Sequence, residues 1–202
     1  MFPAGRFERQ AVFSPCVSMI VIINGSFGAG KTTVANLVRN AFPGSAVYDP
    51  EWAGLILRRL PGWFALKGSG TDDFQDIELW RKLTVAGIRL FSFLAAGKVI
   101  VPMTFTCRAY LDEVVAGIRR HDPETRVFCL KAGLPTVKKR LAGRGTKIEG
   151  PGSEWMARRI IECTEAHRDS HFGEPVETED RPACEVAEYI IRKLQPPDAA
   201  AA

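Results

Sequence analysis

The chain has 202 residues and a composition that is ordinary for a soluble globular protein. This length predicts one domain, with at most a small insert, and allows a full core without disulfides or bound metals. The net charge of +4 is too mild to indicate a nucleic-acid-binding protein, but it suits an anionic ligand such as a nucleotide.

The five cysteines are odd in number, scattered and never arranged as C-x-x-C. This usage predicts reduced thiols in a cytoplasmic protein. No apolar run reaches the length of a transmembrane helix, and the first residues lack the continuous apolar region of a signal peptide. We therefore expect a cytoplasmic protein without a transmembrane segment, and peripheral contact with a membrane stays open.

Three segments are expected along the chain. Residues 1–18 have little pattern and contain prolines that interrupt helices and strands, so we expect a poorly patterned N-terminal extension. Residues 19–194 carry the periodic elements of one domain. Residues 195–202 form a low-complexity tail that we expect to be disordered.

The domain begins with a glycine-rich loop. Residues 25–32 match the pattern G-x-x-x-x-G-K-[ST] at every required position. An apolar run over 17–23 predicts a buried strand before the loop, and apolar residues at helical spacing over 33–41 predict a helix after it. A glycine-rich turn that only joins a strand to a helix is the alternative, but it would not need the complete motif in this context.

The residue types of this loop suit the binding of phosphate and a metal ion. Glycines let successive backbone N–H groups point at one phosphate, and the N-terminus of the helix adds a positive dipole. Lys31 can reach the outer phosphates, and the Thr32 hydroxyl can bind Mg²⁺. The residues expected to bind the nucleotide are Gly25, Ser26, Phe27, Gly28, Ala29, Gly30, Lys31, Thr32 and Thr33.

An acid follows the second expected strand. This strand spans residues 45–48, and Asp49 comes directly after it. Ligands bind at the carboxyl edge of open α/β sheets, so Asp49 is a candidate site residue. The alternative is a turn residue before Pro50, which is common loop chemistry.

Residues 52–66 are unusually apolar and include Trp52, Trp63 and Phe64. The stretch predicts either a helix and loop that pack into the core or a cover that contacts an apolar substrate. The sequence leaves both interpretations open.

A long helix is expected over residues 74–96, because apolar residues recur there at steps of three and four. Gln75 and Arg81 lie near its start, where they can face the cleft. The third strand, over 98–105, ends at Thr104 and Thr106 without the aspartate that many NTPases carry there. Asp49 is therefore the leading acid for metal binding or proton transfer.

Four arginines flank a second glycine-rich loop. Arg140 and Arg144 precede it, and Arg158 and Arg159 follow it. This arrangement is expected of a mobile lid whose arginines point at phosphates, whereas the alternative is a solvated basic face. The remaining helices are expected over 110–120, 134–141 and 182–194, and the remaining strands over 125–130 and 175–178.

Cys163, His167 and His171 recur every four residues and would share one face of a helix. Sulfur and imidazole at this spacing can bind a metal ion, but no fourth ligand is evident. A structural face of the helix is the interpretation that we favour.

Strands alternate with helices throughout, which predicts an α/β fold of the P-loop NTPase type. We expect a parallel sheet of about five strands, flanked by helices and completed by a lid that carries arginines.

Several motifs together resemble a known family. Residues 22–32, Val47-Tyr48-Asp49-Pro50-Glu51, Asp72-Asp73-Phe74-Gln75, Leu79-Trp80-Arg81 and Ile100-Val101-Pro102-Met103-Thr104 resemble the bacterial tunicamycin-resistance ATP-binding proteins. The resemblance covers residues 19–194, and the first eighteen residues depart from it. It implies ATP binding and protection against a nucleoside antibiotic.

Two classes of function follow from these motifs. The first is a kinase that moves the γ-phosphoryl group of ATP to a small molecule, with Lys31 and Thr32 holding phosphates and Mg²⁺, Asp49 accepting the hydroxyl proton, and Arg140, Arg144 and Arg158 neutralising charge. The second is a module that sequesters the antibiotic with ATP as a switching ligand. In either case the substrate-binding residues expected are Asp49, Trp52, Trp63, Phe64, Gln75, Arg81, Thr104 and Thr106.

Overall fold

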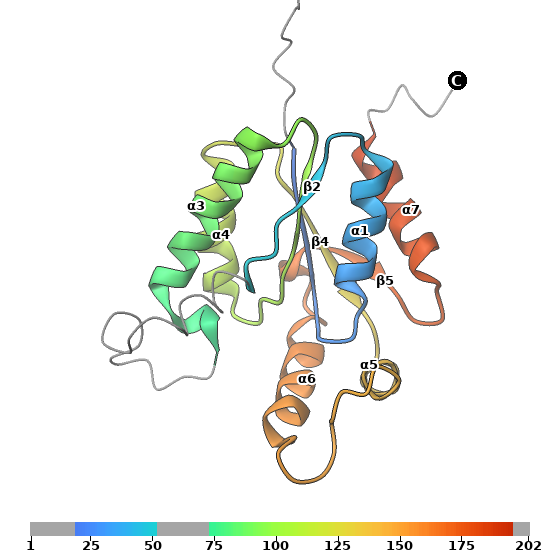
Figure 1. Cartoon of the computed structure of the whole chain (residues 1–202). Coiled ribbons are helices and arrows are strands. Elements are labelled where there is room, and N and C mark those ends of the chain that lie inside the picture. Colours follow the sequence, from blue (N-terminus) through green and yellow to red (C-terminus); the bar gives the residue numbers. More distant parts are fainter. Residues whose placement is uncertain (1–18, 52–72, 196–202) are drawn as a thin grey trace, which may run out of the picture.

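The computed structural model describes residues 19–51 and 73–195 (Figure 1). Its strands are β1 (Ile20–Gly25), β2 (Ala46–Val47), β3 (Val99–Pro102), β4 (Arg126–Lys131) and β5 (Glu174–Glu177). They form one sheet in the order β2-β3-β1-β4-β5, and every pairing is parallel. The five-stranded parallel sheet expected from the sequence is confirmed.

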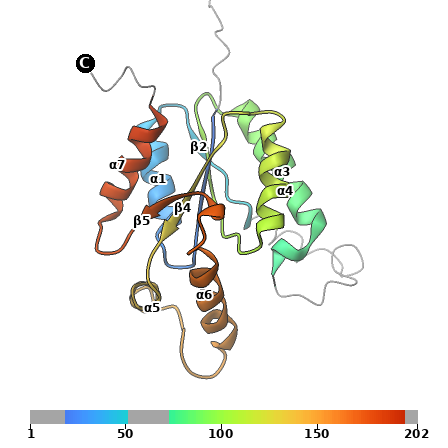
Figure 2. The same cartoon turned by 180° about the vertical axis from the view of Figure 1, so that it is seen from behind.

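Helices cover both faces of this sheet (Figures 1 and 2). One face carries α1 (Lys31–Ala41) and α7 (Ala183–Leu194), and the other carries α3 (Glu78–Leu94) and α4 (Arg108–Arg119). Beyond the carboxyl ends of the strands lie α5 (Leu134–Ala142) and α6 (Glu154–Ala166). Two short 3₁₀ helices, η1 (Phe74–Asp76) and η2 (Ser170–Phe172), precede α3 and β5.

The core follows the two faces of the sheet. Alternate residues of β1 point to opposite faces, so Ile22 packs on the side of α3 and α4 while Ile23 packs on the side of α1 and α7. Because both faces are covered, the first four residues of β1 are all apolar instead of alternating with polar residues. A smaller cluster of Val137, Leu141 and Ile160 joins α5 to α6.

The long helix begins later than the periodicity predicts. Residues 74–96 were expected to form one helix, but α3 starts at Glu78 after the separate turn η1. The Asp73 carboxylate accepts the backbone N–H of Gln75 at 3.0 Å, which stabilises a local turn instead of a continuous helix. This break turns Gln75 toward the carboxyl edge of the sheet.

Asn24 ties the end of β1 to two other segments. Its Oδ1 accepts the backbone N–H of Gly25 and of Phe105, both at 2.9 Å, and its Nδ2 donates to the Phe172 carbonyl at 3.3 Å. The side chain is fully buried. The start of the glycine loop, the segment after β3 and η2 therefore share one hydrogen-bonded junction.

We expect Asn24→Ala to lower the free energy of unfolding markedly. It leaves buried N–H groups unpaired, and each such group costs about 1–3 kcal/mol. Urea denaturation measures the loss, and Asn40→Ala, on the exposed side of α1, is the matched control. An Asn24→Ala protein that unfolds at the same urea concentration as the control would contradict a structural role for this junction.

Some expectations concern residues outside the described ranges. The N-terminal extension, the apolar stretch with Trp52, Trp63 and Phe64, and all of the tail except Gln195 lie there. Within the described ranges, no helix combines the length and the apolarity that crossing a bilayer requires.

Candidate active site

The glycine loop lies between β1 and α1, as the motif predicts. Gly25 has φ 152°, and a Cβ at this position would lie 2.9 Å from the Leu130 carbonyl oxygen of β4. Gly28 has φ 78°, and its Cβ would approach the Leu141 side chain of α5 at 3.0 Å. Only glycine fits both the backbone conformation and the space at these two positions.

Lys31 is held at the centre of this loop. Its ammonium group donates to the Ser26 carbonyl at 2.9 Å and lies 5.5 Å from the centroid of the Phe27 ring. Burial lowers the pKa of Lys31 to about 8, although the nearby carboxylates of Glu51 and Asp49 oppose this shift. The cation therefore points into the loop and remains largely protonated at neutral pH.

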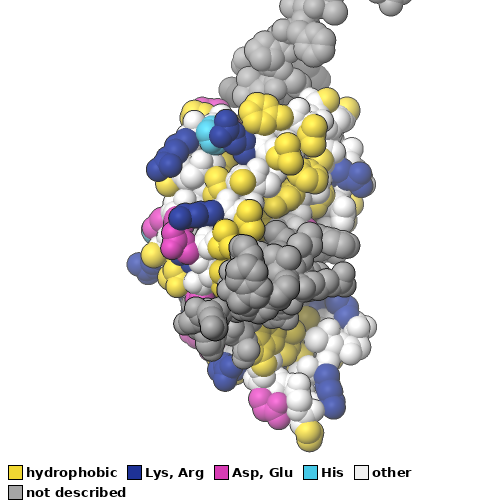
Figure 3. Space-filling model, turned by 60° about the vertical axis from the view of Figure 1, so that its left-hand side comes forward, with side chains coloured by type: hydrophobic (Ala, Val, Ile, Leu, Met, Phe, Trp, Pro, Cys, Tyr) yellow, Lys and Arg dark blue, Asp and Glu magenta, His cyan; other side chains and the backbone are white. Residues whose placement is uncertain are grey.

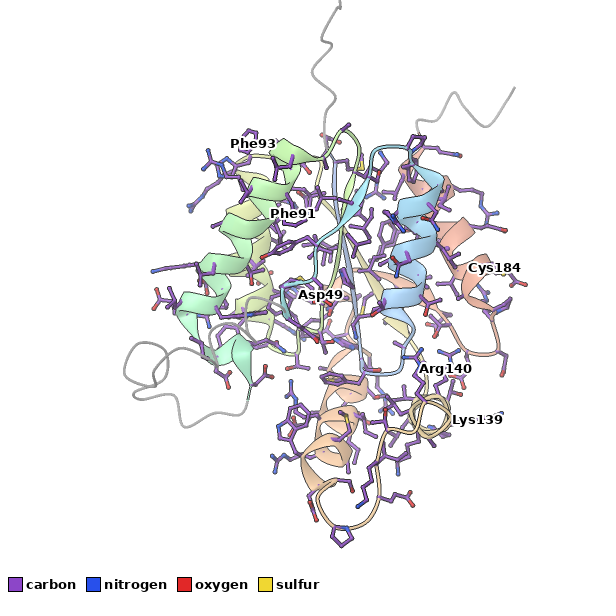
Figure 4. All side chains as sticks on the ribbon, viewed as in Figure 1. Asp49, Phe91, Phe93, Lys139, Arg140 and Cys184 are labelled. Atoms are coloured by element: carbon purple, nitrogen blue, oxygen red, sulfur yellow. The ribbon has the colours of Figure 1, made fainter. Side chains whose placement is uncertain are left out.

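A cavity of about 250 Å³ opens over the loop, which we call the phosphate cavity. Lys31, Thr32 and glycines of the loop line it together with Asp49, which lies two residues after the end of β2 (Figure 4). Arg144 and Thr146 also line this cavity. The structure thus brings Asp49 to the phosphate loop, as its position after a strand predicts.

Glu51 is a second acid at this site, and the sequence analysis did not select it. Its backbone N–H donates to the Asp49 carboxylate at 2.9 Å, so the two acids belong to one turn. Partial desolvation of its carboxyl, followed by the charge of Asp49, raises the pKa of Glu51. Two acids separated by one residue directly after a strand, as in Asp49-Pro50-Glu51, are the sequence signal that could have identified Glu51.

A second cavity, of about 180 Å³, lies beside the first and is called here the acceptor cavity. It shares Phe27 and Glu51 with the phosphate cavity. Aromatic side chains form much of its wall, and Phe27 meets Trp155 edge to face at 6.1 Å between ring centroids. The remaining lining residues are Pro50, Asp73, Gln75, Trp80, Met103, Thr104 and Arg159.

Some polar groups of the acceptor cavity are held by contacts within the protein, and others have no hydrogen-bond partner among the described residues. The Arg159 guanidinium forms an ion pair with Asp73, and Gln75 Nε2 donates to the same carboxylate at 3.3 Å. In contrast, Thr104 Oγ1 and Arg159 Nε are buried without a hydrogen-bond partner among the described residues. Buried polar atoms are normally paired, so these two indicate a place for a ligand.

Besides Asp49, two of the predicted substrate residues that the structure describes do not line the acceptor cavity. Arg81 is buried beneath it, where its guanidinium pairs with Glu113 and donates to the Gln75 carbonyl, each at 2.6 Å. Its charge is thus used to hold Gln75 in place, which corrects the expectation that it faces the cleft. Thr106 lines a neighbouring polar cavity of about 290 Å³ and donates its backbone N–H to Gln75 Oε1 at 3.3 Å.

Arg140, Arg144 and Arg158, which were expected to point at phosphates from one lid, have different surroundings. Arg140 donates to the Thr178 carbonyl at 2.6 Å and to its hydroxyl at 3.0 Å, so it is tied to the loop after β5 (Figure 4). Arg140 and Arg144 line a cavity of about 440 Å³ beside Gly30 and Thr33. Arg158 instead lies near Glu162 and does not line the phosphate cavity, which corrects its expected role.

The base of α6 is fixed by a buried imidazole. His167 Nε2 lies 2.7 Å from the Phe105 carbonyl, and burial lowers the pKa of His167 to about 4. The neutral ring therefore donates this hydrogen bond at physiological pH, which anchors the helix that carries Trp155 and Arg159.

The histidine pattern does not form a metal site among the described residues. Helix α6 ends at Ala166, so Cys163, His167 and His171 do not share one helical face. His171 instead pairs with Asp112 at 2.9 Å. This corrects the interpretation favoured from the sequence, a structural face of one helix, although each histidine does make a structural contact.

A five-stranded parallel sheet with a complete glycine loop between β1 and α1 defines a P-loop protein of kinase-like fold. The chain belongs to the AAA domain family, which matches residues 20–159. No protein of curated function matches the sequence.

Solved structures share this fold. The tunicamycin resistance protein of Deinococcus radiodurans is 29% identical, with 89% of this chain and 99% of that chain covered and a TM-score of 0.68. A sugar kinase of Janibacter sp. HTCC2649 is 20% identical over 92% and 99% of the two chains, with a TM-score of 0.57. Shikimate kinase of Acinetobacter baumannii is 16% identical over 89% and 94%, with a TM-score of 0.55. The resemblance indicated by the sequence motifs is confirmed by the first of these similarities.

Proposed function

We propose that this protein is a cytoplasmic ATP-dependent phosphotransferase that modifies a small nucleoside antibiotic of the tunicamycin kind. The observation that carries the proposal is the wall shared by the two cavities. Phe27 and Glu51 line both the phosphate cavity and the acceptor cavity, so a phosphoryl donor and an acceptor would meet at Glu51. Direct transfer needs this proximity of the two reactants.

The residues of the phosphate cavity fit a nucleoside triphosphate. Lys31 and the N–H groups of the glycine loop would hold the outer phosphates, and Arg144, which lines the same cavity, would neutralise charge. The larger cavity beside Gly30 and Thr33, lined by Arg140, has room for the nucleoside part of ATP. Arg140 then contributes by shaping that cavity through its hydrogen bonds to Thr178.

The phosphate cavity also fits a magnesium ion. The Thr32 hydroxyl and the Asp49 carboxylate line it together, and hard oxygen ligands of this kind are those that Mg²⁺ prefers. Bound there, the ion would neutralise phosphate charge. Asp49 then has a role that differs from proton transfer.

Glu51 is the better placed of the two acids to accept the proton of the acceptor hydroxyl. It lines the acceptor cavity, whereas Asp49 lines only the phosphate cavity. A carboxyl with a raised pKa is a stronger base once ionised, which suits general base catalysis near neutral pH. This assignment revises our expectation from the sequence, which gave the base to Asp49.

The acceptor cavity fits a head group that is both planar and polar. Trp80, Trp155 and Phe27 provide apolar walls, while Thr104 Oγ1 and Arg159 Nε offer unpaired hydrogen-bonding atoms. Nucleoside rings have this combination of a π-face and polar edges. The similarity to the Deinococcus radiodurans tunicamycin resistance protein supports the choice of acceptor.

The test is mass spectrometry of tunicamycin after incubation with the protein, ATP and Mg²⁺. We expect the antibiotic to gain the mass of one phosphoryl group while ATP becomes ADP. Lys31→Ala, which lacks the phosphate-binding ammonium group, is the negative control. An antibiotic that binds but keeps its mass would identify the protein as an ATP-dependent sequestering module instead.

A further inference from the structure

The segment between β3 and α4 reaches the acceptor cavity without the support of regular structure. Met103 donates its backbone N–H to the Ile23 carbonyl at 3.0 Å, but residues 104–107 belong to no strand or helix. Thr104 lines the acceptor cavity, and Thr106 lines the polar cavity beside it. Backbone groups in a buried segment need hydrogen-bond partners, so side chains have to supply what the sheet does not.

Three side chains bind the two peptide groups that flank Phe105. The Phe105 N–H donates to Asn24 Oδ1 at 2.9 Å, and its carbonyl accepts from His167 Nε2 at 2.7 Å. The N–H of Thr106 donates to Gln75 Oε1 at 3.3 Å. Each peptide group is planar, so holding both groups fixes the two backbone dihedrals between them. The directions of the side chains before and after Phe105 are fixed as a result.

His167 differs from the other two partners because it comes from the helix that also lines the acceptor cavity. It directly follows the last residue of α6, and Trp155 and Arg159 of that helix line the cavity together with Thr104. The hydrogen bond from His167 to Phe105 therefore joins the two elements that supply these residues. It sets where the Thr104 hydroxyl lies relative to α6.

The inward side of α3 supports the same segment. The centroids of the Trp80 and Phe105 rings lie 6.3 Å apart, and Trp80 also lines the acceptor cavity. Hydrophobic side chains on the outward side of this helix are exposed (Figure 3). The Phe105 side chain is fully buried, so a shift of its backbone would also disturb the wall that Trp80 forms.

Stability alone does not explain a histidine at position 167. The side chain is buried, and its Nδ1 has no hydrogen-bond partner among the described residues, which is costly for a buried polar atom. The ring packs edge to face on Phe172 at 5.5 Å between centroids, a contact that an apolar ring could also make. What the imidazole supplies beyond packing is the N–H that holds the Phe105 carbonyl.

We propose that His167 is a positioning residue for the acceptor, which it serves by holding Phe105 and thereby the Thr104 hydroxyl. The proposal rests on the proposed function, in which Thr104 binds the acceptor. His167 lines neither the acceptor cavity nor the phosphate cavity, so it acts through the segment and not by contact with a ligand. Loss of its hydrogen bond therefore weakens binding of the acceptor and leaves binding of ATP unchanged.

The test compares two replacements of His167 in calorimetric titrations with tunicamycin and with ATP. His167→Leu keeps an apolar side chain of similar size without a donor, whereas His167→Gln keeps an N–H that can reach the Phe105 carbonyl. We expect His167→Leu to weaken tunicamycin binding about three- to tenfold, the typical effect of one lost hydrogen bond. ATP binding should be unchanged in both variants, and His167→Gln should retain the affinity for tunicamycin. His171→Leu, which removes the pair with Asp112, is the matched control and should change neither affinity.

A double-mutant cycle with Thr104→Val tests the route through which His167 acts. If His167 positions the Thr104 hydroxyl, removal of this hydroxyl costs less tunicamycin affinity in the His167→Leu protein than in the unmodified protein. Equal costs in the two proteins would overturn the proposal, and so would equal losses of tunicamycin and ATP affinity in His167→Leu. Circular dichroism melting checks the fold, and His167→Met replaces His167→Leu in the cycle if the latter does not fold.

Failure of the proposed function gives a different result. Tunicamycin that binds without gaining a phosphoryl group contradicts the phosphotransferase but leaves every titration above decisive. If tunicamycin does not bind to the unmodified protein, the choice of acceptor is wrong and amide hydrogen exchange decides the positioning role. Faster exchange at Phe105 and Thr106 in His167→Leu, with the glycine loop unchanged, supports that role, and unchanged exchange at both overturns it.

Discussion

Lys31→Ala lowers the rate of phosphoryl transfer about 10²–10³-fold, which is the typical effect of removing one group that stabilises transition-state charge. It also weakens nucleotide binding, because the ammonium group at the centre of the loop is the group aimed at the outer phosphates. The fold should survive, since the side chain contacts its own loop instead of the apolar core. Calorimetric titration with ATP and a coupled assay for ADP measure the two effects.

The matched control is Lys139→Ala, which removes an exposed lysine of α5 close to the same lid (Figure 4). Lys139→Ala removes one positive charge, as Lys31→Ala does, but leaves the glycine loop intact. If ATP binds equally well to the two variants, Lys31 is not a phosphate ligand and the central assignment fails.

Lys31 also predicts two opposite effects of pH. Its pKa of about 8 in the folded protein lies below the ordinary value of 10.5, so between these values the unfolded chain binds more protons. The contribution of Lys31 to folding stability therefore increases as pH rises through this window. Affinity of the free protein for nucleotide falls over the same window, because the ammonium group loses its charge. Lys31→Ala should lack both trends.

Glu51→Gln is the second variant for which we expect a large effect. Loss of a general base lowers turnover by roughly 10²–10⁴-fold. ATP affinity should not fall, because Glu51 is an anion beside Lys31 and supplies no positive charge to the phosphates. Since the pKa of Glu51 is raised in the free protein, the acid limb of the pH profile of kcat/KM should begin above the ordinary range of a glutamate and should disappear in the variant. Stopped assays of product formation across the acidic range measure both.

Asp49→Asn distinguishes the roles of the two acids. If Asp49 helps to hold Mg²⁺, its variant needs more Mg²⁺ for half-maximal rate but retains the acid limb. Glu188→Gln, on the exposed side of α7, controls for the loss of one carboxylate. A Glu51→Gln enzyme with full turnover, together with an Asp49→Asn enzyme that has lost its acid limb, would return the base to Asp49.

The phosphate half of the site could be predicted from sequence because its residues are local. The loop, Lys31 and Thr32 are adjacent in the chain, and a strand before them and a helix after them fix their geometry. Asp49 could also be placed, since it follows a strand and carboxyl ends of parallel strands share one edge of the sheet.

The acceptor half could not be predicted with the same success, because it depends on the rotation of helices. Arg158 and Arg159 are neighbours in sequence but lie about 100° apart around α6, and only Arg159 reaches the cavity. Which of the two arginines faces the cavity depends on where α6 begins, and the sequence pattern does not set that residue. Arg81 was misplaced for a related reason, because the turn at η1 sets where α3 begins.

The wall shared by the two cavities has a consequence for inhibitor design. Phe27 and Glu51 line both cavities, so a ligand in one would lie about one side chain away from a ligand in the other. A nucleotide joined through its terminal phosphate to an acceptor-like ring could therefore occupy both at once. Joining two weak ligands makes the second binding step intramolecular, which raises overall affinity without any new contact. Phe27→Ala should reduce the affinity for each half of such a compound. A substitution at Phe27 that weakens the inhibitor would therefore also weaken binding of the protein's own nucleotide and acceptor.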